Sequence, residues 1–307
     1  MNYEEFKKKI IDELITFYED DAQVIVAHVT KNNGIELEGV SIRHKDSEQE
    51  AIPLVYLNYL YDTYQKKEFD IDTCVGMIVD MIEKKSGKES IKWFVHDIME
   101  WERIKEDVYP ILVSTESNPE SLSSLISINW LDLSICYLIR RRMGLNEFSI
   151  KINEELFENY GISKEELHKQ AILNLEKDGY GIYDLGQCIQ AMMNNEDTRR
   201  ISTPEVQSGE MYIFRNESAC YGAAGILSQK ILWETIGYAG LDCYIIPSSV
   251  HEVIFLPATS DMIEEFQEER LDEVIREVNE TKVKKEELLA DHCYYYNAQT
   301  GEITIRR

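Results

Sequence analysis

The chain has 307 residues, with 57 acidic side chains against 32 basic ones, so its formal net charge is −25. At about 150 residues per domain, this length allows two domains or one large domain. Hydrophobic residues make up 44% of the chain and aromatic residues 10%, which is enough for a packed core and argues against a disordered chain. Because an acidic chain repels phosphate groups, direct nucleic-acid binding and docking on an anionic membrane are both disfavoured.

The sequence lacks the usual signals for export, membrane insertion and metal binding. Asp12 and Glu13 interrupt the apolar stretch that a secretory signal needs, and no window approaches the roughly 18 apolar residues of a membrane span. The six cysteines lie far apart without a Cys-x-x-Cys pair, so we expect neither a zinc site nor disulfides. Nucleotide-binding and His-Glu-x-x-His motifs are absent, and we expect no metal and no cofactor. These patterns indicate a cytoplasmic protein.

Residues 1–105 are expected to form an N-terminal unit of a helix, a β-hairpin and further helices. Apolar residues recur every four positions from Phe6 to Tyr18, which predicts an amphipathic helix ending near Glu19. Alternating residues around Asn32-Asn33-Gly34 predict a hairpin, with a bulge at Gly39 where the alternation slips by one residue. Three helices are expected after it, over Pro53–Tyr64, from the capping residue Asp70 to Ser86-Gly87, and over Trp93–Ile104.

Residues 106–307 are expected to form a C-terminal α+β unit, with a single continuous domain for the whole chain as the alternative. The predicted fold class is α+β, a mixed sheet flanked by helices. Val108–Glu116 is typical of an edge strand because it contains Pro110. Asn129–Arg140 is typical of one buried strand, and Ser163-x-x-Glu166 is typical of a capped helix start. Further strands are expected at Met211–Phe214, Cys243–Ile246 and Val250–Leu256, helices from Gly222 and from the cap Asp261, and a closing hairpin at Tyr294–Tyr296 and Ile303–Ile305.

Two segments of the C-terminal unit contain residues that could support chemistry. In Pro247-Ser-Ser-Val-His-Glu-Val253, a strand would place Ser249 and His251 on one face and Ser248 and Glu252 on the other. In Tyr221-Gly-Ala-Ala-Gly225, small residues open a helix whose first amides could bind an anion. The hypothetical site has Ser249, His251 and Glu252 as catalytic residues and Asn216, Tyr221, Gly222, Ala223 and Ser248 as ligand-binding residues.

These residues support two interpretations. In a hydrolase, Ser249 would attack, His251 would take its proton, and the amides near Gly222 would hold the oxyanion. In a binding protein, the same groups would hold a phosphate or a carboxylate. Cys220 is an alternative nucleophile at the helix start. A structural role remains open as well, since Pro-Ser-Ser is an ordinary turn sequence and His251 could bond only to neighbouring backbone.

The same residues resemble a known bacterial family. Ile246-Pro-Ser-Ser-Val-His-Glu-Val-Ile254, with Tyr221-Gly-Ala-Ala224 and Met211-Tyr-Ile-Phe-Arg-Asn216 before it, is similar to the uncharacterised family called domain of unknown function fifty-six eighty-eight. The resemblance extends over nearly the whole chain. It implies an association with integrative mobile elements of gut anaerobes, and it implies no activity.

The leading interpretation is therefore an acidic, cytoplasmic accessory protein of a mobile element that binds a protein partner. A sharper version is a decoy that occupies the DNA-binding groove of a basic host enzyme. The alternative is the hydrolase or anion-binding protein described above, and whether the protein is an enzyme stays open. A third interpretation is a homo-oligomer that associates through its tyrosine-rich C-terminal surface.

Overall fold

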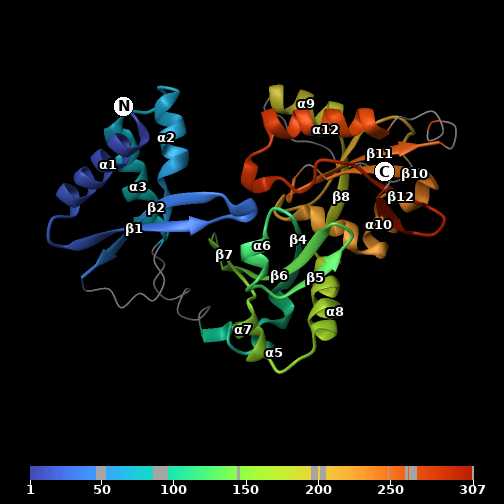
Figure 1. The fold of residues 1–307 in the computed structure, drawn as a ribbon, viewed down its shortest axis with the longest axis horizontal. Coiled ribbons are helices and arrows are strands. Elements are labelled where there is room, and N and C mark those ends of the chain that lie inside the picture. Colours follow the sequence, from blue (N-terminus) through green and yellow to red (C-terminus); the bar gives the residue numbers. More distant parts are fainter. Residues whose placement is uncertain are drawn as a thin grey trace. The chain divides into compact units, whose positions relative to one another are not determined.

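The computed structural model describes residues 1–45, 53–85, 96–143, 146–194, 200, 205–247, 249–259, 262 and 268–305. The chain divides into two compact units, each treated by itself below (Figure 1). The first is Met1–Glu100 with Arg142–Phe148, and the second is Trp101–Arg141 with Ser149–Arg307. Because compactness does not establish independent folding, the division into domains at 105/106 stays a prediction. Among the described helices, none combines the length and apolarity that crossing a bilayer requires.

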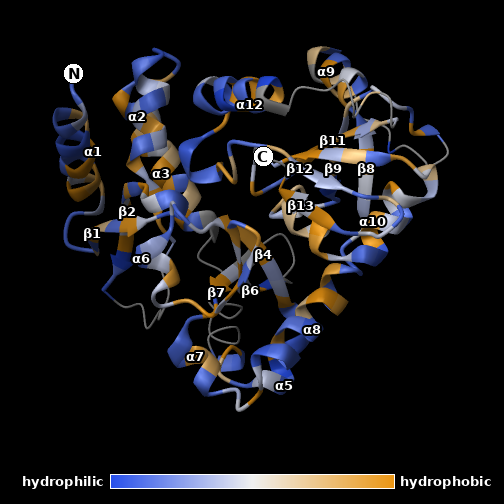
Figure 2. Cartoon of the chain, turned by 45° about the vertical axis from the view of Figure 1, so that its right-hand side comes forward, coloured by the Kyte–Doolittle hydropathy of each residue, from blue (hydrophilic) through white to orange (hydrophobic). Residues whose placement is uncertain are grey.

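The first unit packs helices against a three-stranded antiparallel sheet of order β1-β2-β3. The four residues of the predicted stripe, Phe6, Ile10, Leu14 and Tyr18, are buried, as the four-residue period predicts, whereas Ile15 and Phe17 are exposed. The stripe packs in one core with apolar residues of α2, α3 and the sheet, and Figure 2 colours the hydrophobic residues of these elements orange. The elements are α1 (Tyr3–Tyr18), β1 (Ala22–Thr30), the 3-10 helix η1 (Asn32–Gly34), β2 (Glu36–His44), β3 (Val55–Tyr56), α2 (Leu57–Gln65) and α3 (Ile71–Lys85).

Two predictions for this unit are wrong in detail. The β1–β2 ladder is continuous from Ala22↔His44 to Thr30↔Glu36, so there is no bulge at Gly39; a Cβ there would meet the Leu54 side chain at 2.6 Å, and glycine allows that close approach. The helix expected from Pro53 begins at Leu57, after β3. The Asp70 cap is confirmed, since its carboxylate accepts from the Thr73 amide at 2.9 Å.

The second unit begins with a sheet of order β4-β6-β5, with β7 also paired to β6. β4 lies at the edge, as Pro110 predicts, and Ser163 caps α8 through the Glu166 amide. The single strand expected over 129–140 is instead a hairpin that turns at Leu131, whose φ is +53°. The elements are α5 (Trp101–Ile104), η2 (Lys105–Asp107), β4 (Val108–Ser114), α6 (Pro119–Leu122), β5 (Ser127–Trp130), β6 (Leu133–Met143), β7 (Asn146–Lys151), α7 (Glu154–Glu158) and α8 (Lys164–Leu175). Of the helix expected over 93–104, residues 93–95 lie outside the described residues, and α5 covers only the last four.

The rest of the second unit is a six-stranded sheet of order β13-β12-β10-β11-β9-β8. Its pairings are all antiparallel, so the α+β class is confirmed with an antiparallel sheet in place of the mixed one. The helix α12 covers one face through Leu271 and Ile275; the predicted cap Asp261 lies outside the described residues. The elements are β8 (Tyr180–Asp184), α9 (Leu185–Asn194), β9 (Tyr212–Asn216), η4 (Gly222–Leu227), α10 (Gln229–Thr235), η5 (Gly237–Ala239), β10 (Asp242–Ile246), β11 (Val253–Ala258), α12 (Glu268–Lys282), η6 (Lys285–Glu287), β12 (Tyr294–Tyr296) and β13 (Ile303–Ile305).

The opposite face of this sheet carries a stack of aromatic rings. The ring centroids of Tyr180 and Phe214 are 5.2 Å apart, and those of Phe214 and Phe255 are 4.7 Å apart. The 3-10 helix η4 lies on this stack through Gly225, where a Cβ would come within 2.6 Å of the Phe214 ring. The aromatic face thereby fixes the position of η4 and of the loop before it, which contains the residues that the sequence singled out.

Candidate functional site

The structure brings the two predicted segments together. The Tyr221 amide donates to Nδ1 of His251 at 3.2 Å, and the Ala223 amide donates to the Val250 carbonyl at 3.3 Å. Between them, Gly222 lies so close to the other segment that a Cβ would be 2.5 Å from the His251 carbonyl oxygen. The segments therefore meet mainly through their backbones, without a gap for a ligand between these three residues.

His251 has a defined hydrogen-bonding role in this arrangement. A neutral imidazole has one acceptor nitrogen, and here Nδ1 accepts from the Tyr221 amide, which assigns the proton to Nε2. The imidazole and the Tyr221 ring also lie with their centroids 5.5 Å apart. As a proton acceptor His251 is therefore already engaged, and it could act as a base only after giving up the amide.

Ser249 is bonded to the backbone of His251 and not to its ring. Its Oγ accepts from the His251 amide at 3.1 Å, and Ser249 forms an antiparallel bridge with Leu288. The strand expected from Val250 begins at Val253, so the argument that Ser249 and His251 share a strand face is wrong. Glu252 lies 3.8 Å from Arg215 in a partly exposed ion pair, and Ser248 lies outside the described residues. Nucleophilic catalysis by Ser249 stays a prediction.

The segment that begins at Gly222 is not the α-helix that the sequence predicts. Gly222–Leu227 is a six-residue 3-10 helix, and the α-helix begins only at Gln229, where Ser228 caps it. The strands on either side, β9 and β10, do not pair with each other, because each pairs antiparallel with β11, which lies between them. Ala223 and Ala224 donate to the Val250 and Tyr221 carbonyls, so their amides are not open to an anion.

Asn216 belongs to a buried polar network that the sequence reasoning identified only in part. Its Nδ2 donates to Asp178 at 2.7 Å, and Asp178 accepts from Arg140 at 2.6 Å. Asn216 also binds Cys220 twice, accepting from its amide at 3.1 Å and donating to its carbonyl at 2.9 Å. The backbone of Cys220 is thereby fixed between Ala219 and Tyr221, which both have positive φ values, 49° and 52°.

Electrostatics at this network follow from burial. Burial is the largest single effect on the Arg140 guanidinium and would lower its pKa, but the hydrogen bond to Asp178, the charge of that carboxylate and Tyr109 together raise the net pKa. Burial also raises the pKa values of the Tyr180 and Tyr221 hydroxyls, so both stay protonated near neutral pH. The sequence indicates Arg140 and Asp178 only weakly. Arg140 is a charged residue directly after the apolar run 135–139, and Asp178 is the first residue of an Asp-Gly turn.

The cavity beside this network is too small for a substrate. It is lined by Arg140, Asp178, Asn216, Cys220 and Tyr180, among others, and has a volume of about 10 Å³. That is about the space one water molecule needs. The Tyr180 hydroxyl is buried there without a hydrogen-bond partner among the described residues. The cavity could therefore hold one water that completes the network.

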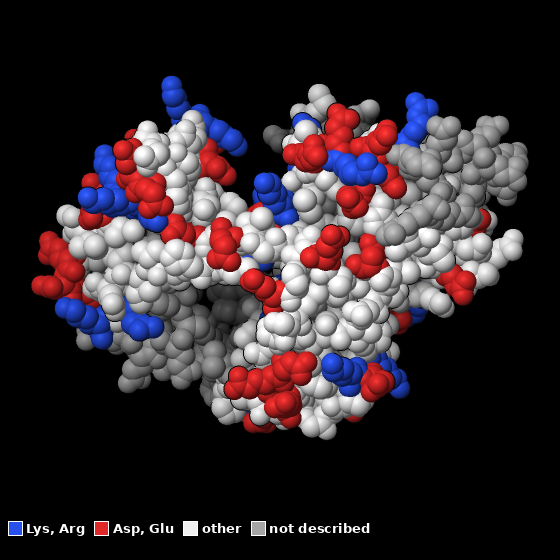
Figure 3. All heavy atoms as spheres, viewed as in Figure 1, with Lys and Arg blue, Asp and Glu red and all other residues white. Residues whose placement is uncertain are grey.

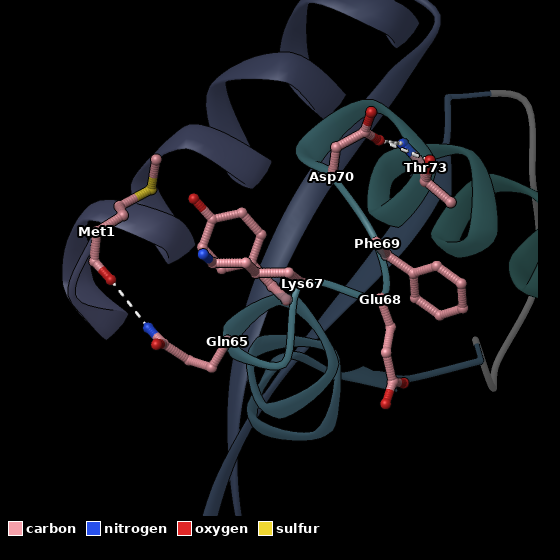
Figure 4. A pocket seen from close by; sticks show the side chains of 8 residues that line it. Met1, Gln65, Lys67, Glu68, Phe69, Asp70 and Thr73 are labelled. Carbon is pink, nitrogen blue, oxygen red and sulfur yellow. Dashed lines mark hydrogen bonds between the residues drawn. The ribbon is translucent and has the colours of Figure 1, made fainter.

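Two larger hollows lie elsewhere on the chain. One, of about 550 Å³, belongs to the first unit and is lined by residues of the 64–73 turn and Met1 (Figure 4). Two of its polar side chains already have structural partners: Gln65 donates to the Met1 carbonyl at 3.0 Å, and Asp70 caps α3. The other, of about 380 Å³, lies beside β13. Among the described residues there is no cluster of three or more His, Cys, Asp or Glu side chains that could hold a metal ion.

Comparison with known proteins identifies a family. The model of a family of unknown function, DUF5688, matches residues 3–298. The chain belongs to this family. Neither the curated proteins nor the solved structures include a match to it. The DUF5688 match covers nearly the whole chain, including both segments of the candidate site.

The close contacts at the small residues predict how the chain responds to an added methyl group. We expect Gly225→Ala to lower the free energy of unfolding by about 1–3 kcal/mol, because the new Cβ would meet the aromatic stack. Gly76→Ala on α3 is the control; nothing lies within 4 Å, and we expect a gain of about 0.5–1 kcal/mol. Urea unfolding measures both. A Gly225→Ala protein as stable as wild type would contradict the packing role.

The His251 contact predicts a second stability effect. His251→Ala leaves the Tyr221 amide without its acceptor, and we expect a loss of about 1–2 kcal/mol in the free energy of unfolding. His251→Asn should recover much of this loss, because its amide oxygen can take the place of Nδ1. Thermal and urea unfolding of the two variants provide the measurement. Equal stability of wild type and His251→Ala would show that the hydrogen bond contributes nothing.

Proposed function

We propose that this DUF5688 protein acts by binding a positively charged protein partner. The observation that carries the proposal is the net charge of −25, which attracts a basic protein and repels nucleic acid and anionic lipid. An accessory role in a mobile element and a cytoplasmic location belong to the same proposal. The location is supported by the six cysteines, which lie far apart in the sequence and of which five are buried.

The exposed side of α12 is the acidic surface that we assign to this role. Glu273, Glu277 and Glu280 are exposed there beside the basic Arg270 and Arg276, and no ion pair joins these acids to another described residue. Figure 3 shows acidic and basic side chains together over α12. Val274 and Val278 lie among them and are 54% and 41% exposed, although valine is usually buried. Apolar side chains beside these acids suit a protein surface with basic residues around an apolar centre, although the exposed Arg276 also lies next to them.

The hydrolase and anion-binding alternatives stay predictions that no described contact favours. His251, Ser249 and Asn216 all have backbone partners in the structure. The proposal of partner binding uses none of these residues, and it assigns them to holding the fold.

The proposal predicts salt-dependent binding that is specific to α12. The probe is a basic nuclease, with the full chain as ligand and fluorescence anisotropy as the measurement. We expect the affinity to fall steeply as salt rises, and labelled duplex DNA to compete. Glu273→Lys/Glu277→Lys/Glu280→Lys should weaken binding more than the charge-matched control Asp12→Lys/Glu13→Lys/Asp20→Lys, whose residues are exposed in the first unit.

Two results would count against the proposal. Absence of binding at low salt would contradict electrostatic attraction to a basic partner. If the two triple variants weaken binding of the nuclease equally, electrostatic attraction still holds but the assignment to α12 is wrong, because the affinity then depends on net charge alone.

A further inference from the structure

We propose that β13 accepts an extended segment of the basic partner as an added strand, with apolar side chains of that segment in the groove beside it. This inference rests on the proposed function for the partner's charge, and it adds where and in what conformation the partner binds. Addition of a strand to an open sheet edge is a general mode of peptide recognition, in which the backbone provides affinity and side-chain pockets provide specificity.

The first support is the open edge of the sheet. β13 is the last strand in the order β13-β12-β10-β11-β9-β8. In the hairpin, the Asn297 amide donates to the Glu302 carbonyl at 2.9 Å, and hydrogen-bonded pairs alternate along an antiparallel ladder. The backbone groups of Ile303 and Ile305 therefore point away from β12. They have no hydrogen-bond partner among the described residues, which leaves donors and acceptors for a further strand.

The second support is the groove of about 380 Å³ that runs beside this edge. It lies on the face of the sheet that carries Ile303, which pairs with Tyr296. Its lining is mixed: Trp130 from β5, Leu227 from η4 and Leu232 from α10 are apolar, whereas Gln229, Glu302 and Thr304 are polar. Trp130 is held in place against Tyr294, with ring centroids 6.1 Å apart. Alternate side chains of an added strand would point into this groove.

Charge complementarity selects the occupant. Glu302 is the one charged residue that lines the described part of the groove. On the other face of the same sheet, α12 carries the exposed acids Glu273, Glu277 and Glu280. A second copy of this chain would bring another charge of −25 to the edge, whereas an extended segment of alternating basic and apolar residues meets both faces favourably. Arg306 and Arg307, which are included in the net charge of −25, follow β13 in the sequence and lie outside the described residues.

The probe for this proposal is a short fluorescent peptide of alternating lysine and valine, with the full chain as receptor. A second peptide has the same sequence with every other backbone nitrogen methylated. Methylation removes hydrogen-bond donors from one edge of the strand without changing charge. We expect the methylated peptide to bind about tenfold more weakly, because it loses backbone bonds to β13.

Variants of the groove provide the matched comparison. Leu227→Lys places a like charge among the apolar walls and should weaken binding of the unmethylated peptide about tenfold, while Leu227→Met keeps the wall apolar and should leave binding unchanged. Ile305→Pro removes one outward-pointing amide and should weaken binding without breaking the ladder to β12. Thermal unfolding of each variant confirms that it is folded.

The outcomes separate this inference from the proposed function. If the affinity falls with salt but is unchanged by methylation of the peptide and by Leu227→Lys, the β13 site is overturned, while the proposal of a basic partner still holds. Failure of every basic probe at low salt would overturn both proposals. A dimer of the chain in sedimentation that Ile305→Pro dissociates would assign the edge to a second copy and overturn the choice of occupant.

Discussion

The fold around the candidate site depends on the buried Arg140–Asp178–Asn216 network. It ties the end of β6 and the turn before β8 to the end of β9, and the side chains of Arg140 and Asp178 are only 9% and 16% exposed. Removing one partner would leave a buried charge uncompensated, which typically costs about 3–5 kcal/mol. Asn216 then holds Cys220 from both sides, so the loop reaches η4 with Tyr221 directed at His251. The candidate site is thus a rigid junction between strands.

This junction also explains the small residues that first indicated a ligand site. The sequence predicts that the helix start at Gly222–Gly225 binds a ligand, but in the structure other parts of the chain approach Gly222 and Gly225 closely. What approaches is the His251 carbonyl in one case and the aromatic stack in the other. A pattern of small residues gives the distance of approach but not the identity of the neighbour, because the neighbour comes from strands far away in the sequence.

The features that the sequence predicted correctly are local ones. The four-residue period of α1, the cap at Asp70 and the aromatic closing hairpin each depend on residues within one or two turns of chain. The turn at Leu131 was missed because an apolar residue with positive φ gives no turn signal within an apolar run. The strand boundary near His251 was missed because Ser249 pairs with Leu288, a contact that alternation cannot reveal. Arg140 and Asp178 were missed since nothing local indicates that they pair.

Because the polar groups of the junction are hydrogen-bonded within the fold, we look for the binding site on the surface of the molecule. α12 packs on one face of the sheet that ends at β13, and we propose that this region binds a basic, extended partner. A protein that binds in this way needs no catalytic constellation. In the proposed function, the junction therefore supports the fold and the sheet edge binds the partner.

Amide hydrogen exchange on the full chain, with and without the lysine–valine peptide, tests this account most directly. The account predicts slower exchange at Ile303 and Ile305 when the peptide is bound, with no change at Tyr221 and His251. Slower exchange at Tyr221 and His251, with β13 unaffected, would show that the junction is the binding site and would contradict the account.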